Sequence, residues 1–193
     1  ELAGKYQQMN RAETEKFNHV TYFFNGLNTK VFENEDRILV KSKKVSSYSL
    51  LPEMSAHEIT LKALKSIVKE YYNFILINYA NADMVGHSGD RLAGKIAVET
   101  IDQQLELVVD CAIKNDYTVL ITADHGNIEE IISPQTGEPQ TSHSRNDVPF
   151  IVEDNDLYGK IKLKNGILAD IAPTIIKLMD LRKPVEMTGK ELF

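Results

Sequence analysis

The sequence predicts an α/β protein, a three-layer sandwich with a mainly parallel central sheet. Three observations carry this prediction. Short runs rich in β-branched and aromatic residues alternate with longer helical patterns. Two of these runs, 74–80 and 118–123, are almost continuously apolar, which is typical of parallel strands covered on both faces. A segment of helix length separates them and provides the crossover that parallel strands need. We therefore expect these two strands at the centre of the sheet.

The first part of the chain is expected to add edge elements to this sheet. The run HVTYFFN (19–25) has the β-branched and aromatic composition of a strand. Residues 30–42 are expected to form a small hairpin that turns around Asn34 to Asp36. Basic and polar side chains in this segment suit a solvent-facing edge.

Two helices are expected to pack on the sheet. Residues 55–71 carry apolar side chains at every fourth position along one face, and Ser55 with Glu58 has the spacing of a capping box. Residues 91–114 keep a longer apolar stripe and lead the chain back to the strand at 118. Both segments are therefore predicted to be amphipathic helices.

The last third of the chain holds a loop, a strand and a helix. Residues 132–149 are rich in Pro, Gly, Ser and Thr, and loops of this length within a compact domain are usually functional. A strand is expected over 148–153. The final helix is expected over 167–180, with either a kink at Pro173 or a helix that begins there.

Composition narrows the class of partner. The formal net charge is -6 and the pI is near 5.4, which favours neither nucleic acid nor an anionic membrane. No apolar run approaches the roughly 18 residues of a membrane span. The single cysteine, Cys111, excludes an internal disulfide and is expected to be a buried thiol on a helix. We expect a soluble cytoplasmic protein with a small-molecule partner, and a chain that starts without Met suggests part of a longer protein.

Acid and histidine residues follow both predicted central strands. Asp83 and His87 come after the first strand, and Asp124 and His125 come directly after the second. Because ligands collect at the carboxyl ends of parallel strands, we expect these side chains to share one crevice. A third histidine, His143, lies in the long loop and can return to the same edge. Three of the five histidines would then lie together.

Carboxylates mixed with imidazoles indicate a transition metal, since calcium and magnesium prefer oxygen ligands alone. Five ligands exceed the need of one tetrahedral ion, so a pair of ions is expected. Two-metal sites promote displacement at phosphorus, which makes phosphoryl transfer the leading chemistry. Taken singly, each acid would equally suit a helix cap or a turn. His57 is expected at the surface and His19 in packing, so neither joins the predicted ligands.

Four motifs make the chain similar to a known family. They are, in chain order, ETEKFNHVTYFFNG, NYANADMVGHSG, TADHGN and TSHSRNDVP. From about Arg11 to its end, the chain resembles the C-terminal part of the cofactor-independent phosphoglycerate mutases, which belong to the alkaline phosphatase superfamily. TADHGN alone would indicate only the superfamily, whereas ETEKF together with NADMVGHSG narrows the resemblance to these mutases.

The resemblance implies an alkaline-phosphatase-like fold and a glycolytic isomerase. Such an enzyme interconverts 3-phosphoglycerate and 2-phosphoglycerate through a phosphoserine intermediate, with two manganese ions and without 2,3-bisphosphoglycerate. By the family's pattern, Asp83, His87 and His143 would hold one ion. Asp124 and His125 would help to hold the other. Lys16 matches a lysine that binds the phosphoryl group, and ligand type alone leaves manganese, cobalt and zinc open.

The chain also departs from the family. The nucleophilic serine, a further metal-binding aspartate and an inserted substrate-binding domain have no counterpart here. We therefore expect residues 1–193 to be the C-terminal portion of a phosphatase-like metal-binding domain, inactive without the missing N-terminal part of the same, monomeric enzyme. Two alternatives remain open. One is another metal-dependent phosphomutase or phosphatase of the superfamily, and the other is an inert metal-binding module when isolated.

Overall fold

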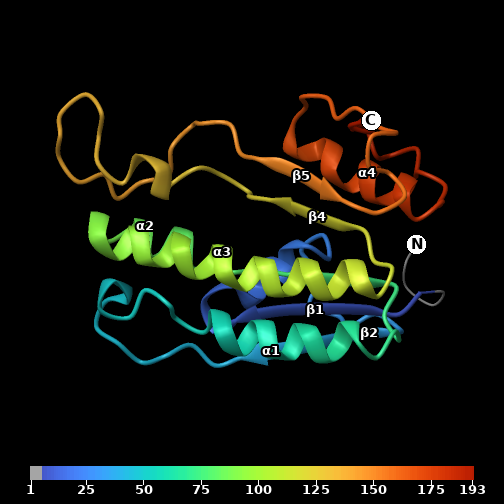
Figure 1. Cartoon of the computed structure of the whole chain (residues 1–193), viewed down its shortest axis with the longest axis horizontal. Coiled ribbons are helices and arrows are strands. Elements are labelled where there is room, and N and C mark those ends of the chain that lie inside the picture. The colour runs from blue at the N-terminus through green and yellow to red at the C-terminus, as the bar shows by residue number, and fades with distance from the viewer. Residues whose placement is uncertain (1–5) are drawn as a thin grey trace.

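A strand made mostly of polar residues lies at the centre of the main sheet. The computed structural model describes residues 6–193 and contains a three-stranded parallel sheet in the order β2-β1-β3 (Figure 1). These strands are β1 (Gln8–Glu13), β2 (Glu35–Val40) and β3 (Phe74–Ile77). The mixed α/β class with a small parallel sheet is confirmed. The strand β1 was not predicted from the sequence, because its residues, QMNRAE, do not alternate between apolar and polar.

Every residue of β1 is buried, and three of its polar side chains, those of Asn10, Arg11 and Glu13, have partners outside the strand. Toward one face, Arg11 Nη2 donates to Ser66 Oγ at 2.8 Å, and a Glu13 carboxylate oxygen accepts from the main-chain N–H of Ser55 at 3.0 Å. These contacts tie β1 to the helix that covers this face. Burial of unpaired polar groups is unfavourable, so the pairing fixes which helix lies there.

Two helices, α1 (Ala56–Ile67) and α3 (Arg91–Lys114), lie side by side across the same face of the sheet (Figure 1). Both confirm predicted helices, and α3 has the predicted bounds. Asp90 caps α3 by accepting from the N–H groups of Leu92 and Ala93, each at 3.0 Å. The core between the helices and β3 is built from apolar side chains, namely Ala63, Ile67, Val108, Ala112, Ile75 and Ile77.

The predicted capping box at the start of α1 is wrong. Ser55 is the N-cap residue, but its side chain makes no capping bond and instead donates to the carbonyl of Lys41. Glu58 forms an ion pair with Lys43. The carboxylate of Glu13 accepts from Ser55 N, so a side chain of the central strand takes over part of the capping role.

The predicted strand at 19–25 is also wrong, because this segment forms a π-helical turn, η2 (His19–Phe23). Thr21 Oγ1 donates to the carbonyl of Phe17, one turn earlier. Phe24, directly after the turn, stacks on Phe74 of β3 with ring centroids 5.9 Å apart. Phe24 therefore contacts the sheet at Phe74, although Phe23 and Phe24 both remain exposed. The strand in this part of the chain is β1 and not residues 19–25.

The hairpin expected over 30–42 does not form. Its second half is β2, which pairs in parallel with β1, and the chain turns at Asn34 with a φ of 64°. The carboxylate of Glu35 organises this region. It accepts hydrogen bonds from four groups, namely Asn10 Nδ2, Asn25 Nδ2, the main-chain N–H of Phe32 and the guanidinium of Arg37.

The two apolar strands predicted at the sheet centre lie elsewhere. In the described part of the chain, β3 pairs only with β1, and β4 (Val119–Thr122) pairs only with β5 (Phe150–Glu153), in an antiparallel ribbon. The ribbon lies along the side of α3 away from α1 (Figure 1). The residues of β3 are only half-buried, so their apolar run suggested a deeper position than the one they occupy. The strand predicted at 148–153 is confirmed as β5.

The final helix, α4 (Ile171–Leu178), begins two residues before Pro173. Pro173 therefore lies in the first turn, where its missing N–H leaves no helical hydrogen bond unmade. Cys111 lies on α3 as expected, although it is only half-buried. Within residues 6–193, no helix is both long and apolar enough to cross a membrane.

Replacing Glu35 with Ala should destabilise the protein by about 3 kcal/mol, because Arg37 and Asn10 would lose their shared acceptor in the interior. Urea unfolding of the two proteins measures the difference. The same change at exposed Glu33, two residues earlier, is the matched control and should have an effect within about 0.5 kcal/mol. Equal effects of the two substitutions would contradict the role given to Glu35.

Candidate metal centre

The segments that follow the carboxyl ends of three strands lie close together around Asp83. β1 leads into the short helix η1 (Thr14–Lys16), β3 leads into α2 (Asn81–Gly86), and β4 is followed by Asp124 and His125. Asp83 lies on α2, and His87 follows its last turn. The expectation that both acid and histidine pairs meet at one edge agrees with this arrangement.

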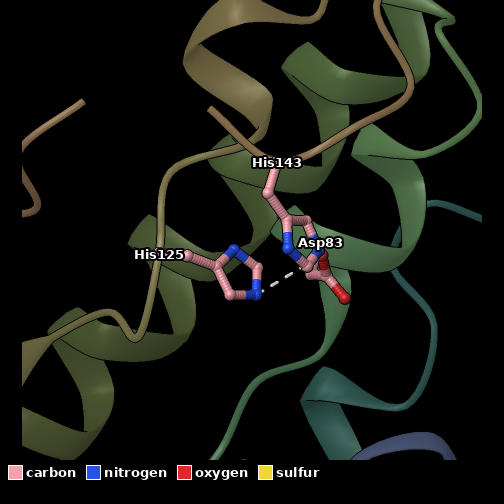
Figure 2. A group of neighbouring side chains, drawn as sticks. All are labelled: Asp83, His125 and His143. Carbon is pink, nitrogen blue, oxygen red and sulfur yellow. Dashed lines mark hydrogen bonds and ion pairs between the residues drawn. The ribbon is translucent and has the colours of Figure 1, made fainter. Parts of the chain in front are cut away.

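Asp83 is the centre of the cluster. Its Oδ1 atom lies 3.0 Å from His87 Nε2, 3.1 Å from His143 Nε2 and 3.9 Å from His125 Nε2. Figure 2 shows His125 and His143, which come from different segments of the chain, directed at Asp83. Each of these three residues offers one ligand atom, and the three atoms lie within 4.8 Å of one another.

The contact of His87 Nδ1 with the main chain determines which of its two ring nitrogens carries the hydrogen. His87 Nδ1 lies 2.6 Å from the carbonyl oxygen of Thr141, which can only accept, so Nδ1 carries the hydrogen. His87 Nε2 then presents a lone pair to Asp83 Oδ1. Two lone pairs 3.0 Å apart repel unless a cation or a proton lies near them. The donor set therefore fits a metal ion, and the Thr141 contact is the kind of outer hydrogen bond that orients a metal-binding histidine.

Lys16 holds the other oxygen of the same carboxylate. Its ammonium lies 2.5 Å from Asp83 Oδ2, and both side chains are largely buried. Burial raises the pKa of Asp83, but hydrogen bonds from Lys16 and Asn127 outweigh it and lower the pKa to about 2. Asp83 is therefore a carboxylate at neutral pH, and its Oδ1 faces the imidazoles while also accepting from Asn127 Nδ2.

The loop that carries His143 is fastened near this edge. The main-chain N–H of Ser144 donates to the carbonyl of Gly126 at 2.9 Å, and Ser144 Oγ donates to the carboxylate of Glu129. The long loop predicted over 132–149 thus returns to the strand end, as its expected role required. His143 remains about half exposed.

The other predicted site residues lie around this centre. Asp124 has a side chain that is 60% exposed and contacts His125, with Asp124 Oδ1 3.6 Å from His125 Nε2. The contact places Asp124 at the rim of the cluster. The rings of His125 and His143 stack with centroids 3.6 Å apart. His57 is exposed on α1, as expected.

Two residues near the site were not identified from the sequence. His19 was expected only to pack. Burial and then the charge of Lys16 lower its pKa, and the charges of Asp124 and Asp83 oppose this shift, so His19 is within electrostatic reach of the site. The signal was its position three residues after Lys16. Asn127 donates from Nδ2 to Asp83 Oδ1 at 2.9 Å, and its position two residues after His125 was the only signal.

Comparison with known proteins agrees with this chemistry. Residues 3–183 match the model of the metalloenzyme superfamily. A 2,3-bisphosphoglycerate-independent phosphoglycerate mutase from Ehrlichia ruminantium (strain Gardel) is 51% identical over 185 residues, which cover 96% of this chain and 36% of that protein. The enzyme of the same name from Clostridium acetobutylicum is 51% identical over 186 residues, with the same coverage. The chain therefore spans only about a third of the length of these relatives.

A solved structure shares the fold. The crystal structure of Leishmania mexicana phosphoglycerate mutase, determined at low cobalt concentration, matches with a TM-score of 0.89 and 28% identity. The match covers 97% of this chain and 37% of that one. The chain is therefore homologous to a portion of the cofactor-independent mutases.

The depressed pKa of Asp83 predicts a pH-dependent stability. An acid whose folded pKa is lowered from 3.8 to about 2 stabilises the fold fully above its unfolded pKa, and this stability is lost as pH falls toward 2. Without metal, D83N should be less stable than the parent by about 2 kcal/mol near pH 6. The difference should shrink below about pH 4. Urea unfolding in a chelator measures it, and a pH-independent difference would contradict the ion pair with Lys16.

Proposed function

Since the chain belongs to the metalloenzyme superfamily, we propose that it is the metal-holding part of a cofactor-independent phosphoglycerate mutase. The whole enzyme would interconvert 3-phosphoglycerate and 2-phosphoglycerate through a phosphoserine intermediate, with no need for 2,3-bisphosphoglycerate. One observation carries the proposal. A carboxylate oxygen of Asp83 faces three imidazoles at the end of three converging strands, in a chain about half identical to such mutases.

The proposal assigns the metal ligands to two divalent ions, with manganese the first candidate. Asp83, His87 and His143 would hold one ion, and Asp124 with His125 would contribute to the second. The short distances from Asp83 Oδ1 to His87 and His143 support the first group. The ligand atoms of His125, Asp83 and His143 lie within 4.8 Å of one another, which supports a place for His125 beside the first group. When bound, the ions supply positive charge that stabilises the transferring phosphoryl group.

Lys16 is proposed to bind the phosphoryl group of the substrate. Its ammonium is a mobile point charge with three donors, and Asp83 holds it at the site edge. An N–H of Lys16 that does not contact Asp83 can donate to a phosphate oxygen. The hydrogen bond to Asp83 keeps the flexible lysine chain in one position, which lowers the entropy lost when the substrate binds.

The nucleophile is proposed to come from outside this chain. Among the serines nearest the site, Ser88 Oγ donates to the carbonyl of Val85, and Ser144 Oγ donates to Glu129. Neither contacts an imidazole that could accept its proton. The chain also spans only 36% of its relatives. We therefore propose that the remaining part of the same enzyme supplies the serine, a further aspartate and the substrate-binding domain, as one monomeric cytoplasmic protein.

The proposed domain assignment follows from this division. Residues 1–193 would be the C-terminal portion of a phosphatase-like metal-binding domain. A different metal-dependent phosphomutase or phosphatase of the superfamily would use the same DH pair and distant histidine. The identity of about 50% to phosphoglycerate mutases favours the mutase. In isolation, the chain would act as a metal-binding module without turnover.

The parent chain should bind at least one manganese ion, and D83A and H143A should each weaken that binding by more than about 100-fold. Each change removes a proposed ligand, which should have a larger effect than the roughly 10- to 100-fold loss typical of outer hydrogen-bond partners. Isothermal titration calorimetry measures the affinity. H57A, at an exposed histidine on α1, is the control and should bind as the parent does. If either ligand variant kept the parent's affinity, its assignment would be wrong.

The purified 193-residue chain should not interconvert 3-phosphoglycerate and 2-phosphoglycerate, because no residue in it is proposed to carry the phosphoryl group. The longer protein that contains the missing segments should do so in the same assay with manganese. An enolase-coupled assay or phosphorus NMR measures the conversion. Turnover by the 193-residue chain alone would refute the assignment of the nucleophile to another segment.

A further inference from the structure

We propose that Asn127 is a positioning residue that fixes the carboxylate of Asp83 for metal binding, and that Glu129 couples Asn127 to the loop that carries His143. The inference rests on the proposed metal site. It adds two residues that are not ligands themselves. Three observations carry it, namely the two hydrogen bonds from one amide to Asp83, the close packing of that amide against Gly86, and the position of Glu129 between two segments.

The side-chain amide of Asn127 contacts Asp83 twice. Nδ2 donates to Asp83 Oδ1 at 2.9 Å and to the main-chain carbonyl of Asp83 at 3.2 Å. Both partners can only accept, so the NH2 end of the amide must face them. One NH2 group thus spans the main chain and the side chain of the same residue. This arrangement restricts rotation of the Asp83 side chain and directs Oδ1, the oxygen that faces the imidazoles.

The amide of Asn127 is buried and packs closely against Gly86. Asn127 is 4% exposed, and a Cβ at Gly86 would collide with its Oδ1 and Cγ atoms. Among the described residues, Asn127 Oδ1 is buried without a hydrogen-bond partner. A buried acceptor left unpaired is unfavourable. The Asn127 side chain therefore leaves its Oδ1 unpaired while its NH2 group donates to Asp83. We infer that the orientation of Asp83, a proposed metal ligand, is what this arrangement serves.

Glu129 connects this amide to the loop on the other side of the site. Its Oε2 accepts from the main-chain N–H of Asn127 at 2.8 Å. Its Oε1 accepts from Ser144 Oγ and from Asn146 Nδ2, the latter at 3.1 Å. Ser144 directly follows His143. One carboxylate thus joins the residue that holds Asp83 to the segment that supplies a second ligand.

The test measures manganese affinity of the 193-residue chain after Asn127→Ala. Loss of an outer hydrogen-bond partner typically weakens metal binding by roughly 10- to 100-fold, and we expect a loss in that range. Asn115→Ala is the matched control, because Asn115 Nδ2 also donates to a carbonyl, that of Cys111, at the far end of α3. The control should bind manganese within about threefold of the parent, even where thermal unfolding shows a similar loss of stability.

Gly86→Ala provides a second, independent variant. It leaves Asn127 in the sequence, but the added Cβ would lie 2.8 Å from Asn127 Cγ and closer still to its Oδ1, so the amide must shift from its present position. Gly86→Ala should weaken manganese binding as Asn127→Ala does, and the double variant should lose little more than either single one, since both act through the same hydrogen bonds. If Asn127→Ala does not fold, Gly86→Ala alone carries the test. The visible spectrum of bound cobalt, which reports the arrangement of its ligands, should change in both variants and remain the same in Asn115→Ala.

The outcomes separate this inference from the proposed function. A parent chain that binds manganese, with Asn127→Ala and Gly86→Ala that bind within threefold of it, would overturn the positioning role and leave the metal site intact. A parent chain that binds no manganese would overturn both. A loss of affinity confined to Asn127→Ala and Gly86→Ala, with an altered cobalt spectrum, would support the inference.

Discussion

The buried polar side chains of β1 impose the constraint on which the remaining structure depends. A central strand that contains Asn, Arg and Glu is unfavourable unless these side chains find partners inside the protein. Arg11 and Glu13 find theirs on α1 and its N-terminus, and Asn10 finds Glu35 on β2. These partners fix which elements surround the sheet. With them in place, the end of β1 carries Lys16 to Asp83.

The local patterns of the sequence predicted part of the fold and which acid and histidine residues lie close together. Acid and histidine residues after apolar strands predicted a shared edge, and their distances to Asp83 agree with it. The long helix α3 was predicted with its bounds, because a continuous apolar stripe is a local feature of the sequence. The strand β1 could not be predicted, since its stability comes from partners distant in the sequence. The prediction of a strand at 19–25 was wrong for the same reason, because the stacking of Phe24 on the distant Phe74 does not require a strand.

The packing around strands β3 and β4, like the proposed active site, is incomplete in this chain, because their apolar residues are only half-buried. β3 and β4 are rich in apolar residues, share a core with α3, and are half-buried in this chain. Their composition exceeds what this degree of burial requires. A longer enzyme in which further segments cover these strands would account for both facts. The same segments would supply the serine and the further aspartate that the proposed reaction needs. Packing of these segments on the sheet would then complete both the core and the active site.

The position of β1 also has a consequence for the order of folding. Gln8 pairs with Phe74, and the main-chain N–H of Gln7 donates to Asn73, 66 residues later. Contacts between such distant residues form slowly, because a large loop must close before they gain any stabilisation. β1 emerges before both of its neighbours in the sheet, and β3, the second of them, follows only after β2 and α1. Its polar composition suits that interval, because a strand with few apolar side chains has little tendency to aggregate while it waits for its partner.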